Sequence, residues 1–294
     1  MKLWSKDVLQ GLFHLVIHRH RGHLSHYIRG RRLRSGHAQP VQGLSFGHRR
    51  GSSRGGEGLA QALEELRHEG KVLLLTNNST KSRRGTAERL ASAGIPATPE
   101  EVLPSSYIAA RFLRSRFGAV RFWLIGEEGI LAEMAEAGHV LVSPKEAEWL
   151  VVGMDRGLTY EKLALALQAL LRGAKLLATN EDPTFPTPEG LVPGAGAVVG
   201  ALRGMGFPPE FVVGKPSPIS FQIALESLGA SPKEVLMIGD RLDTDIAGAQ
   251  TLGMDTALVL SGVTTLADLA KAGIRPTYVA ADLLALVRGK LISG

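Results

Sequence analysis

The chain contains no cysteine among its 294 residues. Disulfides, thiolate metal sites and a cysteine nucleophile are therefore excluded. The lack of cysteine fits a reducing compartment, and we expect a cytoplasmic location, although many secreted proteins lack cysteine as well. The chain also has no unbroken apolar run of membrane-spanning length, so we expect no transmembrane helix and no membrane partner.

Acidic residues are almost missing from residues 1–56. This segment has nine Arg, two Lys and seven of the nine His but a single acid, Asp7, whereas residues 57–294 carry 23 basic and 27 acidic side chains. A basic arm can bind the phosphates of nucleic acid, but these residues follow no clear period, and we expect no nucleic-acid partner. The order of charge and apolar residues also differs from a secretory signal. A disordered extension and an incorrectly translated start are the remaining interpretations.

From Glu57 onward, short apolar runs alternate with amphipathic stretches. Residues 57–70 place Leu59, Leu63 and Leu66 on one helical face, and the predicted helix ends at Gly70. Strand-like runs follow, and these are KVLLLTNN, RFWLIGE, EWLVVGMD, KLLATN, EFVVGKP, EVLMIGD and TALVLSG. Near-continuous apolar strands that alternate with helices predict an α/β fold with a doubly wound, Rossmann-like parallel sheet covered on both faces.

Ligands of such sheets bind at the carboxyl ends of the strands, and three of these ends are polar. In TNNS (76–79), the Thr76 hydroxyl and the free N–H groups of a helix start suit an anion, and Asn77 adds a donor. An ordinary helix cap is the alternative. In GKP (214–216), Lys215 can reach a phosphate as a point charge, or it is a solvated surface lysine.

The third polar strand end is GDRLDTD (239–245). Asp240, Asp243 and Asp245 crowd together there, and clustered carboxylates repel one another unless a cation or a hydrogen-bond network is present. Mg²⁺, a hard cation that prefers oxygen ligands, is the natural occupant. Helix capping by Asp243, with Asp245 in the first turn, is the alternative. That alternative leaves Asp240 unexplained.

The order and spacing of the three motifs resemble the haloacid dehalogenase-like (HAD) hydrolase superfamily. The closest resemblance is to the NagD-like and 4-nitrophenyl phosphatase-like branch, which has a large α/β cap inserted after the second motif. ATNEDPTFPTPEGLVPGAGAVVGAL (178–202) is similar to that branch's return from cap to core. The resemblance covers roughly residues 55–290, and it implies a core of residues 57–95 and 186–294 with a cap of residues 96–185.

The resemblance also implies roles for individual residues. Thr76 binds the transferring phosphoryl group, and Asn77 helps to position phosphate or substrate. Lys215 neutralises the phosphoryl group and steadies the nucleophile. Asp240 ligates Mg²⁺, and Asp245 lies behind that ligand.

Two further residues, Asn180 and Asp182, lie near the implied hinge and could face the leaving group. The implied activity is Mg²⁺-dependent hydrolysis of phosphomonoesters, with a small phosphorylated metabolite as substrate. The resemblance also implies that a homodimer could form through the cap.

The first motif of the family is missing. The resemblance requires an aspartate nucleophile in a DxDG motif on the first, central strand, and this sequence has no DxDG. The usual interval points to residues 42–47, which contain no carboxylate. The run at residues 11–22 echoes the strand and puts His14 and Val16 at the two aspartate positions, but it lies too far upstream. Histidine can carry phosphate, whereas valine cannot act as an acid.

Two explanations remain for this gap. One is a degenerate relative that binds phosphometabolites without catalysis. The other is a shifted reading frame that ends near residues 55–57, and the abrupt change of composition favours it. Under either explanation, we expect this chain to have little or no phosphomonoester hydrolysis. We expect the segment before residue 57 to be irregular or loosely attached, unless VLQGLFHLVIH (8–18) or PVQGLSF (40–46) fills the central slot of the sheet.

Overall fold

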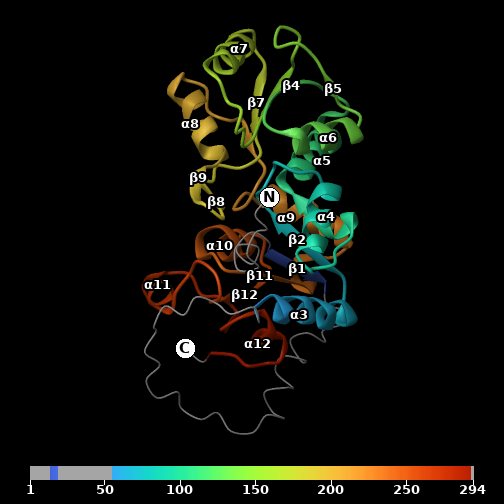
Figure 1. The fold of residues 1–294 in the computed structure, drawn as a ribbon, viewed down its shortest axis with the longest axis vertical. Helices are drawn as coiled ribbons and strands as arrows, with labels where there is room; N and C mark the ends of the chain where they lie inside the picture. The colour runs from blue at the N-terminus through green and yellow to red at the C-terminus, as the bar shows by residue number, and fades with distance from the viewer. Residues whose placement is uncertain (1–13, 19–54, 293–294) are drawn as a thin grey trace.

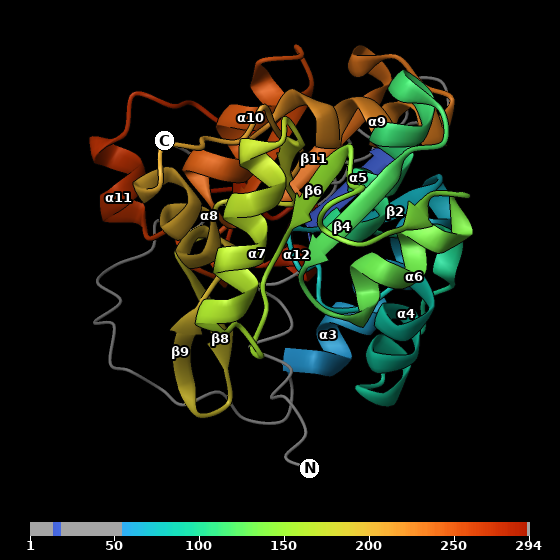
Figure 2. The same cartoon turned by 90° about the horizontal axis from the view of Figure 1, so that it is seen from above.

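Two β-sheets with helices packed against them organise the part of the chain that this computed structural model describes, residues 14–18 and 55–292. Figure 1 shows the smaller sheet, around β4 and β7, above the larger one, and Figure 2 shows the arrangement from above. The predicted α/β fold, a sheet core with an added α/β cap, is confirmed. Within the described residues, no helix is both long and apolar enough to cross a membrane.

The larger sheet has six strands, in the spatial order β13 (Tyr278–Ala280), β12 (Asp255–Val259), β11 (Val235–Gly239), β1 (His14–His18), β2 (Val72–Thr76) and β3 (Val102–Pro104). The helices on one face are α3 (Gly55–Glu69), α4 (Arg83–Ser92) and α12 (Leu283–Val287). Those on the other are α5 (Ser105–Phe117), α9 (Pro218–Leu228) and α10 (Ala247–Gln250), and α11 (Leu266–Lys271) packs beside β12. Cover on both faces explains why these strands are near-continuous apolar runs.

The smaller sheet has five parallel strands, in the order β10 (Phe211–Val212), β7 (Lys175–Ala178), β6 (Trp149–Val152), β4 (Arg121–Ile125) and β5 (Val140–Leu141). Its helices are α6 (Glu128–Glu136), α7 (Tyr160–Leu171) and α8 (Ala195–Gly204). One hydrophobic cluster includes side chains from both sheets, among them Leu75 of β2 and Val151 of β6. The two sheets are therefore joined by a shared core.

The pairing of two strands differs from the limits that the sequence implied for the cap, residues 96–185. β3 falls within that range but pairs with β2 in the larger sheet. β10 follows that range but pairs with β7 in the smaller sheet. Between these two strands, the hairpin of β8 (Thr184–Thr187) and β9 (Gly190–Pro193) forms a separate two-stranded sheet.

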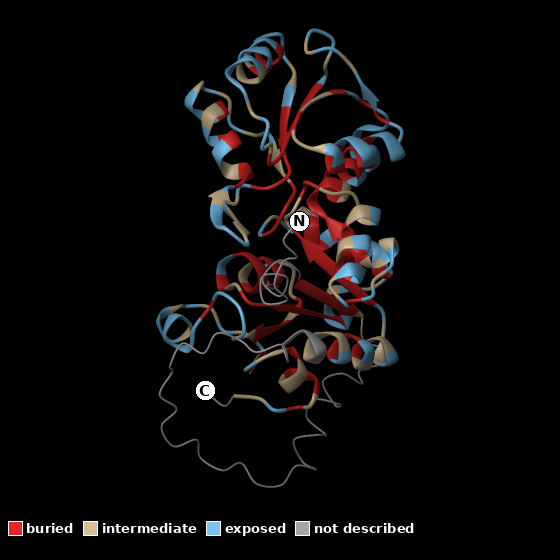
Figure 3. Cartoon of the chain, in the orientation of Figure 1, coloured by how far each residue is buried: buried red, intermediate tan, exposed pale blue. Residues whose placement is uncertain are grey.

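β1 fills the central slot of the larger sheet, but it runs antiparallel to both of its neighbours, β2 and β11. The sheet is therefore mixed rather than wholly parallel as predicted. Val16 packs into the cluster on one face, and Leu15 and Ile17 pack into the cluster on the other. All three side chains are buried, because successive residues of a strand point to opposite faces and both faces are covered (Figure 3).

The expectation that residues before 57 are irregular or loosely attached is wrong for residues 14–18. These residues belong to the run 8–18, one of the two stretches considered for the central slot. Residues 1–13 and 19–54, including the run 40–46, lie outside the described residues. A strand buried on both faces contributes hydrophobic free energy that a loose attachment would not.

Substitution of a buried residue of β1 tests its place in the core. Ile17 is 1% exposed, so Ile17→Ala should leave a cavity and lower the free energy of unfolding by about 2–5 kcal/mol. Urea denaturation followed by circular dichroism measures this change. The exposed α3 residue Glu64 supplies a control, since Glu64→Ala should change stability by less than about 0.5 kcal/mol. Equal stability of the two variants would contradict the central position of β1.

Candidate active site

A cavity of about 290 Å³ lies where the larger sheet, the β8–β9 hairpin and the end of the smaller sheet meet. The ends of β1, β2 and β7 reach its wall, as do the loops that follow β10 and β11. Its lining residues are His14, Thr76, Asn77, Asn78, Ser79, Met154, Asn180, Asp182, Thr184, Phe185, Pro186, Leu191, Gly194, Ala195, Lys215, Arg241, Thr244 and Val263. The polar strand ends found in the sequence therefore converge on one space.

Thr76 and Lys215 are the two predicted phosphoryl-binding residues, and both line this cavity. Thr76 is the last residue of β2 and is 1% exposed, and its Oγ1 accepts a hydrogen bond of 3.2 Å from the Asn78 N–H. Lys215 is 4% exposed, and its Nζ donates to Asp245 Oδ1 at 2.9 Å. Lys215 is thus not a solvated surface lysine, because its ammonium is held in place beside the cavity.

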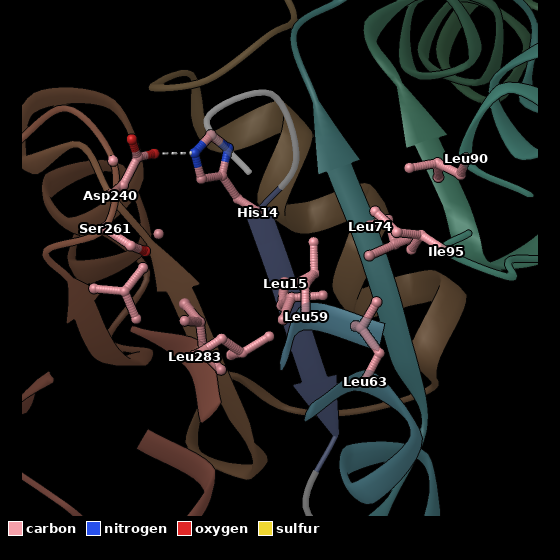
Figure 4. Close-up of a pocket in the computed structure, with 14 residues that line it drawn as sticks. His14, Leu15, Leu59, Leu63, Leu74, Leu90, Ile95, Asp240, Ser261 and Leu283 are labelled. Carbon is pink, nitrogen blue, oxygen red and sulfur yellow. Dashed lines mark hydrogen bonds and ion pairs between the residues drawn. The ribbon is translucent and has the colours of Figure 1, made fainter. Parts of the chain in front are cut away.

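His14 completes the cluster from an unexpected direction. It is the first residue of β1, and it pairs with Leu75, the neighbour of Thr76. Because β1 is antiparallel, its first residue rather than its last lies at the carboxyl ends of β2 and β11. His14 Nε2 is 2.7 Å from Asp240 Oδ1 (Figure 4). It is also 3.0 Å from Asp245 Oδ2, and His14 Nδ1 contacts Lys215 Nζ.

The charges of this cluster shift the pKa values of its members. Burial favours the neutral acid of Asp245, but the charges of His14 and Lys215 outweigh burial and hold its pKa well below the usual range. Burial likewise opposes protonation of His14, with Lys215 adding to that opposition. Asp245 and Asp240 nevertheless outweigh both, and the pKa of His14 is raised.

Both carboxylates have all of their oxygens engaged by protein donors. Asp240 Oδ2 accepts from the Val263 N–H at 2.7 Å, and its Oδ1 faces His14. Asp245 Oδ2 accepts from the Arg241 N–H at 3.0 Å, and its Oδ1 faces Lys215. His14, Asp240 and Asp245 are also the group in the described part of the chain whose side chains could together hold a metal ion.

Asn77 positions the backbone of Lys215. Its Oδ1 accepts from the Lys215 N–H at 2.8 Å, and its Nδ2 donates to the Lys215 carbonyl at 2.9 Å. The same Nδ2 donates to Asp182 Oδ2 at 3.1 Å. The Asn77 side chain, which the sequence predicted to position substrate, is therefore engaged with protein groups on each side. It ties the end of β2 to the loop that carries Lys215, called here the lysine loop.

Asn180 and Asp182 follow β7, where the chain leaves the smaller sheet. Asn180 Nδ2 donates to the Asn77 carbonyl at 2.7 Å, and its Oδ1 accepts from the Asp182 N–H at 3.1 Å. Both residues line the cavity. Their side chains are nevertheless bonded to the loop after β2, so they couple the smaller sheet to that loop.

Helix α6 holds the other side of the same loop. Gly129 N–H donates to the Thr80 carbonyl at 3.2 Å, and a Cβ on Gly129 would lie 2.3 Å from the Lys81 carbonyl carbon. Glu133 is 2% exposed and accepts from the Arg83 N–H at 2.6 Å. Burial raises the pKa of Glu133, against the hydrogen bond and the charge of Arg83. Such close packing gives the loop after β2 little freedom.

Arg241 and Ser79 are among the cavity residues that received no site role from the sequence. Arg241 bonds Asp243 Oδ2 through its Nη2 at 2.9 Å, beside the cavity that it lines. Ser79 is 1% exposed, and its Oγ has no hydrogen-bond partner within the described structure. Arg241 lies inside the motif GDRLDTD and could have been found there. Nothing in the sequence distinguishes Ser79 from a helix cap.

A second, smaller cavity of about 50 Å³ lies on the other side of His14 and Asp240 (Figure 4). Leucines and isoleucines from β1, β2 and the neighbouring helices form most of its wall, among them Leu59, Leu63 and Ile95. Apolar walls of this kind offer a polar ligand few hydrogen-bond partners. This cavity is therefore a packing gap beneath the site rather than a second site.

Known proteins are similar to this chain in both sequence and fold. Residues 54–140 match the description of haloacid dehalogenase-like hydrolases, and residues 212–286 match that of HAD-hydrolase-like proteins. Over 229 residues, the chain is 38% identical to an acid sugar phosphatase of Staphylococcus aureus, which covers 77% of this chain and 88% of that protein. The chain belongs to the haloacid dehalogenase-like hydrolase family.

Solved structures extend the similarity within this family. The p-nitrophenyl phosphatase from Archaeoglobus fulgidus superimposes with a TM-score of 0.74 at 39% identity, over 79% of this chain and 91% of that chain. NagD from Escherichia coli K-12 has a TM-score of 0.71 at 30% identity, over 77% of this chain and 89% of its own. The resemblance to the NagD-like branch of the HAD family is therefore confirmed.

Removal of the Asn77 amide tests its hold on the lysine loop of this HAD-like chain. Asn77→Ala leaves the backbone N–H and carbonyl of Lys215 without these partners, and the free energy of unfolding should fall by about 1–3 kcal/mol. Inorganic phosphate should also bind more weakly, because Lys215 is less well positioned. Urea denaturation and calorimetric titration measure the two effects. Gln168→Ala on the exposed face of α7 is the control, and equal values for both variants would refute the positioning role.

Proposed function

We propose that this HAD-like chain binds small phosphorylated metabolites and is, by descent, a phosphomonoester hydrolase with impaired turnover. One observation carries the proposal: Thr76 and Lys215, from separate strand ends, line the same cavity. A hydroxyl and an ammonium are suited to a phosphoryl dianion. The expected helix start does not take part, because α4 begins at Arg83 and its first residues do not line the cavity. The relatives that are named as an acid sugar phosphatase and a p-nitrophenyl phosphatase support the same substrate class.

In this proposal, Lys215 is the positive group that meets the phosphoryl oxygens, and Thr76 donates its hydroxyl hydrogen to one of them. Asp245 fixes the ammonium of Lys215, and Asn77 fixes its backbone. Asn180 and Asp182 keep Asn77 in place rather than meeting the leaving group. Two residues bind the phosphoryl group and four position them, which is enough for recognition of a phosphate ester.

Impaired turnover follows from the central strand. The family resemblance assigns attack on phosphorus to an aspartate of DxDG, and the proton transfer to a second aspartate. The described central strand offers His14 at the cavity and the apolar Val16 in the core. A neutral, buried valine cannot transfer a proton, so an ordinary HAD turnover has no acid here.

The family resemblance also implies Mg²⁺ at Asp240, and the described residues do not fit that ion. Mg²⁺ prefers an octahedral shell of oxygens and usually keeps several waters. Asp240 and Asp245 instead give their oxygens to His14, Lys215 and two backbone N–H groups. In this arrangement, neither carboxylate has an oxygen without a protein partner for Mg²⁺ to bind.

A second candidate function is a non-catalytic phosphometabolite-binding protein. The engagement of every carboxylate oxygen of Asp240 and Asp245 favours it, because no carboxylate in this cluster is left as a nucleophile or base. Binding without hydrolysis, even after the first motif is supplied, would select this alternative. A homodimer through the cap and a cytoplasmic location stay predictions from the sequence.

Hydrolysis of 4-nitrophenyl phosphate with Mg²⁺ tests the impaired turnover. The rate should be at least about a thousandfold below that of the Archaeoglobus fulgidus p-nitrophenyl phosphatase, because loss of a nucleophile costs that much or more. Robust hydrolysis that disappears in Lys215→Met would refute impairment. Lys233→Met, an exposed lysine before β11, controls for loss of surface charge.

A DxDG strand supplied in place of the segment before residue 57 tests descent from a hydrolase. If the rest of the site is sound, Mg²⁺-dependent hydrolysis should rise well above that of the natural chain, because the nucleophile and the acid are restored together. The same replacement in a Lys215→Met background should stay inactive. Phosphate-ester binding without any gain in hydrolysis would instead select the non-catalytic alternative.

A further inference from the structure

His14 lies in the space between two buried carboxylates. Its Nε2 is 2.7 Å from Asp240 Oδ1 and 3.0 Å from Asp245 Oδ2, which are hydrogen-bond distances. His14 is 5% exposed, Asp240 is 2% exposed and Asp245 is fully buried. A single ring nitrogen therefore bridges two acids that would otherwise repel each other in a medium of low dielectric constant.

The second oxygen of Asp240 also has a protein partner. The loop after β12 covers its outer oxygen, since the Val263 N–H donates to Oδ2 at 2.7 Å. A Cβ on Gly262 would lie 1.9 Å from the same oxygen, so this loop is packed tightly against the carboxylate. Asp240 Oδ1 is thus the oxygen left for a cation, and the His14 imidazole is hydrogen-bonded to it.

Asp245 is equally occupied. Lys215 Nζ and Thr244 Oγ1 lie 2.9 and 3.3 Å from its Oδ1, and the Arg241 N–H is 3.0 Å from its Oδ2. A Mg²⁺ ion would need oxygens at about 2.0–2.1 Å in octahedral directions. Such an ion could reach both carboxylates only after the imidazole had left the space between them.

We propose that the imidazole of His14 is a built-in replacement for the divalent cation: it bridges Asp240 and Asp245, excludes Mg²⁺, and leaves the phosphate pocket able to bind without metal. This proposal needs no particular protonation state. One N–H directed at the two carboxylates satisfies them, and the other ring nitrogen faces Lys215. Lys215 and Thr76 remain at the cavity as the groups that meet an anion.

Direct titration with Mg²⁺ tests the exclusion without reference to activity. Calorimetry of the full chain should detect no Mg²⁺ binding, or binding at least about tenfold weaker than in His14→Ala, a difference of about 1.4 kcal/mol. In the variant, the shorter side chain frees Asp240 Oδ1 and removes one of the two partners of Asp245 Oδ2, which keeps the Arg241 N–H. His68→Gln, an exposed histidine of α3, should behave as the natural chain does. Circular dichroism verifies that each variant is folded.

The Mg²⁺ titration has three possible outcomes. Tighter Mg²⁺ binding in His14→Ala than in the natural chain supports the proposal. Equally tight binding in both proteins overturns it, because the ion would then enter beside the imidazole. Absence of binding in both proteins overturns it as well, since something other than His14 would exclude the ion.

A second measurement uses the natural chain alone and holds even where His14→Ala does not fold. Inorganic phosphate should bind with the same affinity, within about twofold, in EDTA and in saturating Mg²⁺. Phosphate binding that requires Mg²⁺ overturns the metal-free pocket. This phosphate measurement rests on the proposed function, but the two proposals fail in different ways. Absence of phosphate binding under both conditions refutes the phosphate pocket. The Mg²⁺ titration still decides the role of His14.

Discussion

The described site depends on one buried cluster of charged and hydrogen-bonding groups. In it, Lys215 and His14 contact two buried carboxylates, Asp240 and Asp245. Removing charged groups from water costs several kcal/mol for each ion unless partners repay it. Here each carboxylate oxygen has a donor within 3.0 Å. The cluster therefore fixes the end of β11, the lysine loop and the start of β1 relative to one another.

A second network carries this geometry to the smaller sheet. Asn77 bonds both backbone groups of Lys215, and it also bonds Asp182, which lies where the chain leaves β7. On the opposite side, α6 packs against the loop after β2 through Gly129 and Glu133. Any movement of the smaller sheet over the cavity would have to carry or break these contacts. The loop after β2 and the smaller sheet are thus mechanically coupled.

The direction of β1 has the largest chemical consequence. A parallel strand in the central slot would bring its carboxyl end to the cavity, whereas the antiparallel β1 brings its first residue, His14, and places His18 opposite Val235 at the far end. The apolar residues between them alternate between the same two faces in either direction, because period-two alternation is the same when read backwards. The apolar pattern therefore permits the reversed strand, and the chemistry of the site changes with it.

The amino-acid sequence was enough to predict the alternation of strands and helices, the family, and the meeting of the three polar strand ends at one cavity, because apolar periodicity and the rule for strand ends are local properties. It could not determine the direction of β1, the place of His14 between two carboxylates, or the sheet to which β3 and β10 belong. Those features depend on hydrogen bonds and packing between residues far apart in the chain, such as His14 and Asp240. Only the tertiary structure decides contacts of that kind, since no local pattern records which distant partner a strand or a ring will meet.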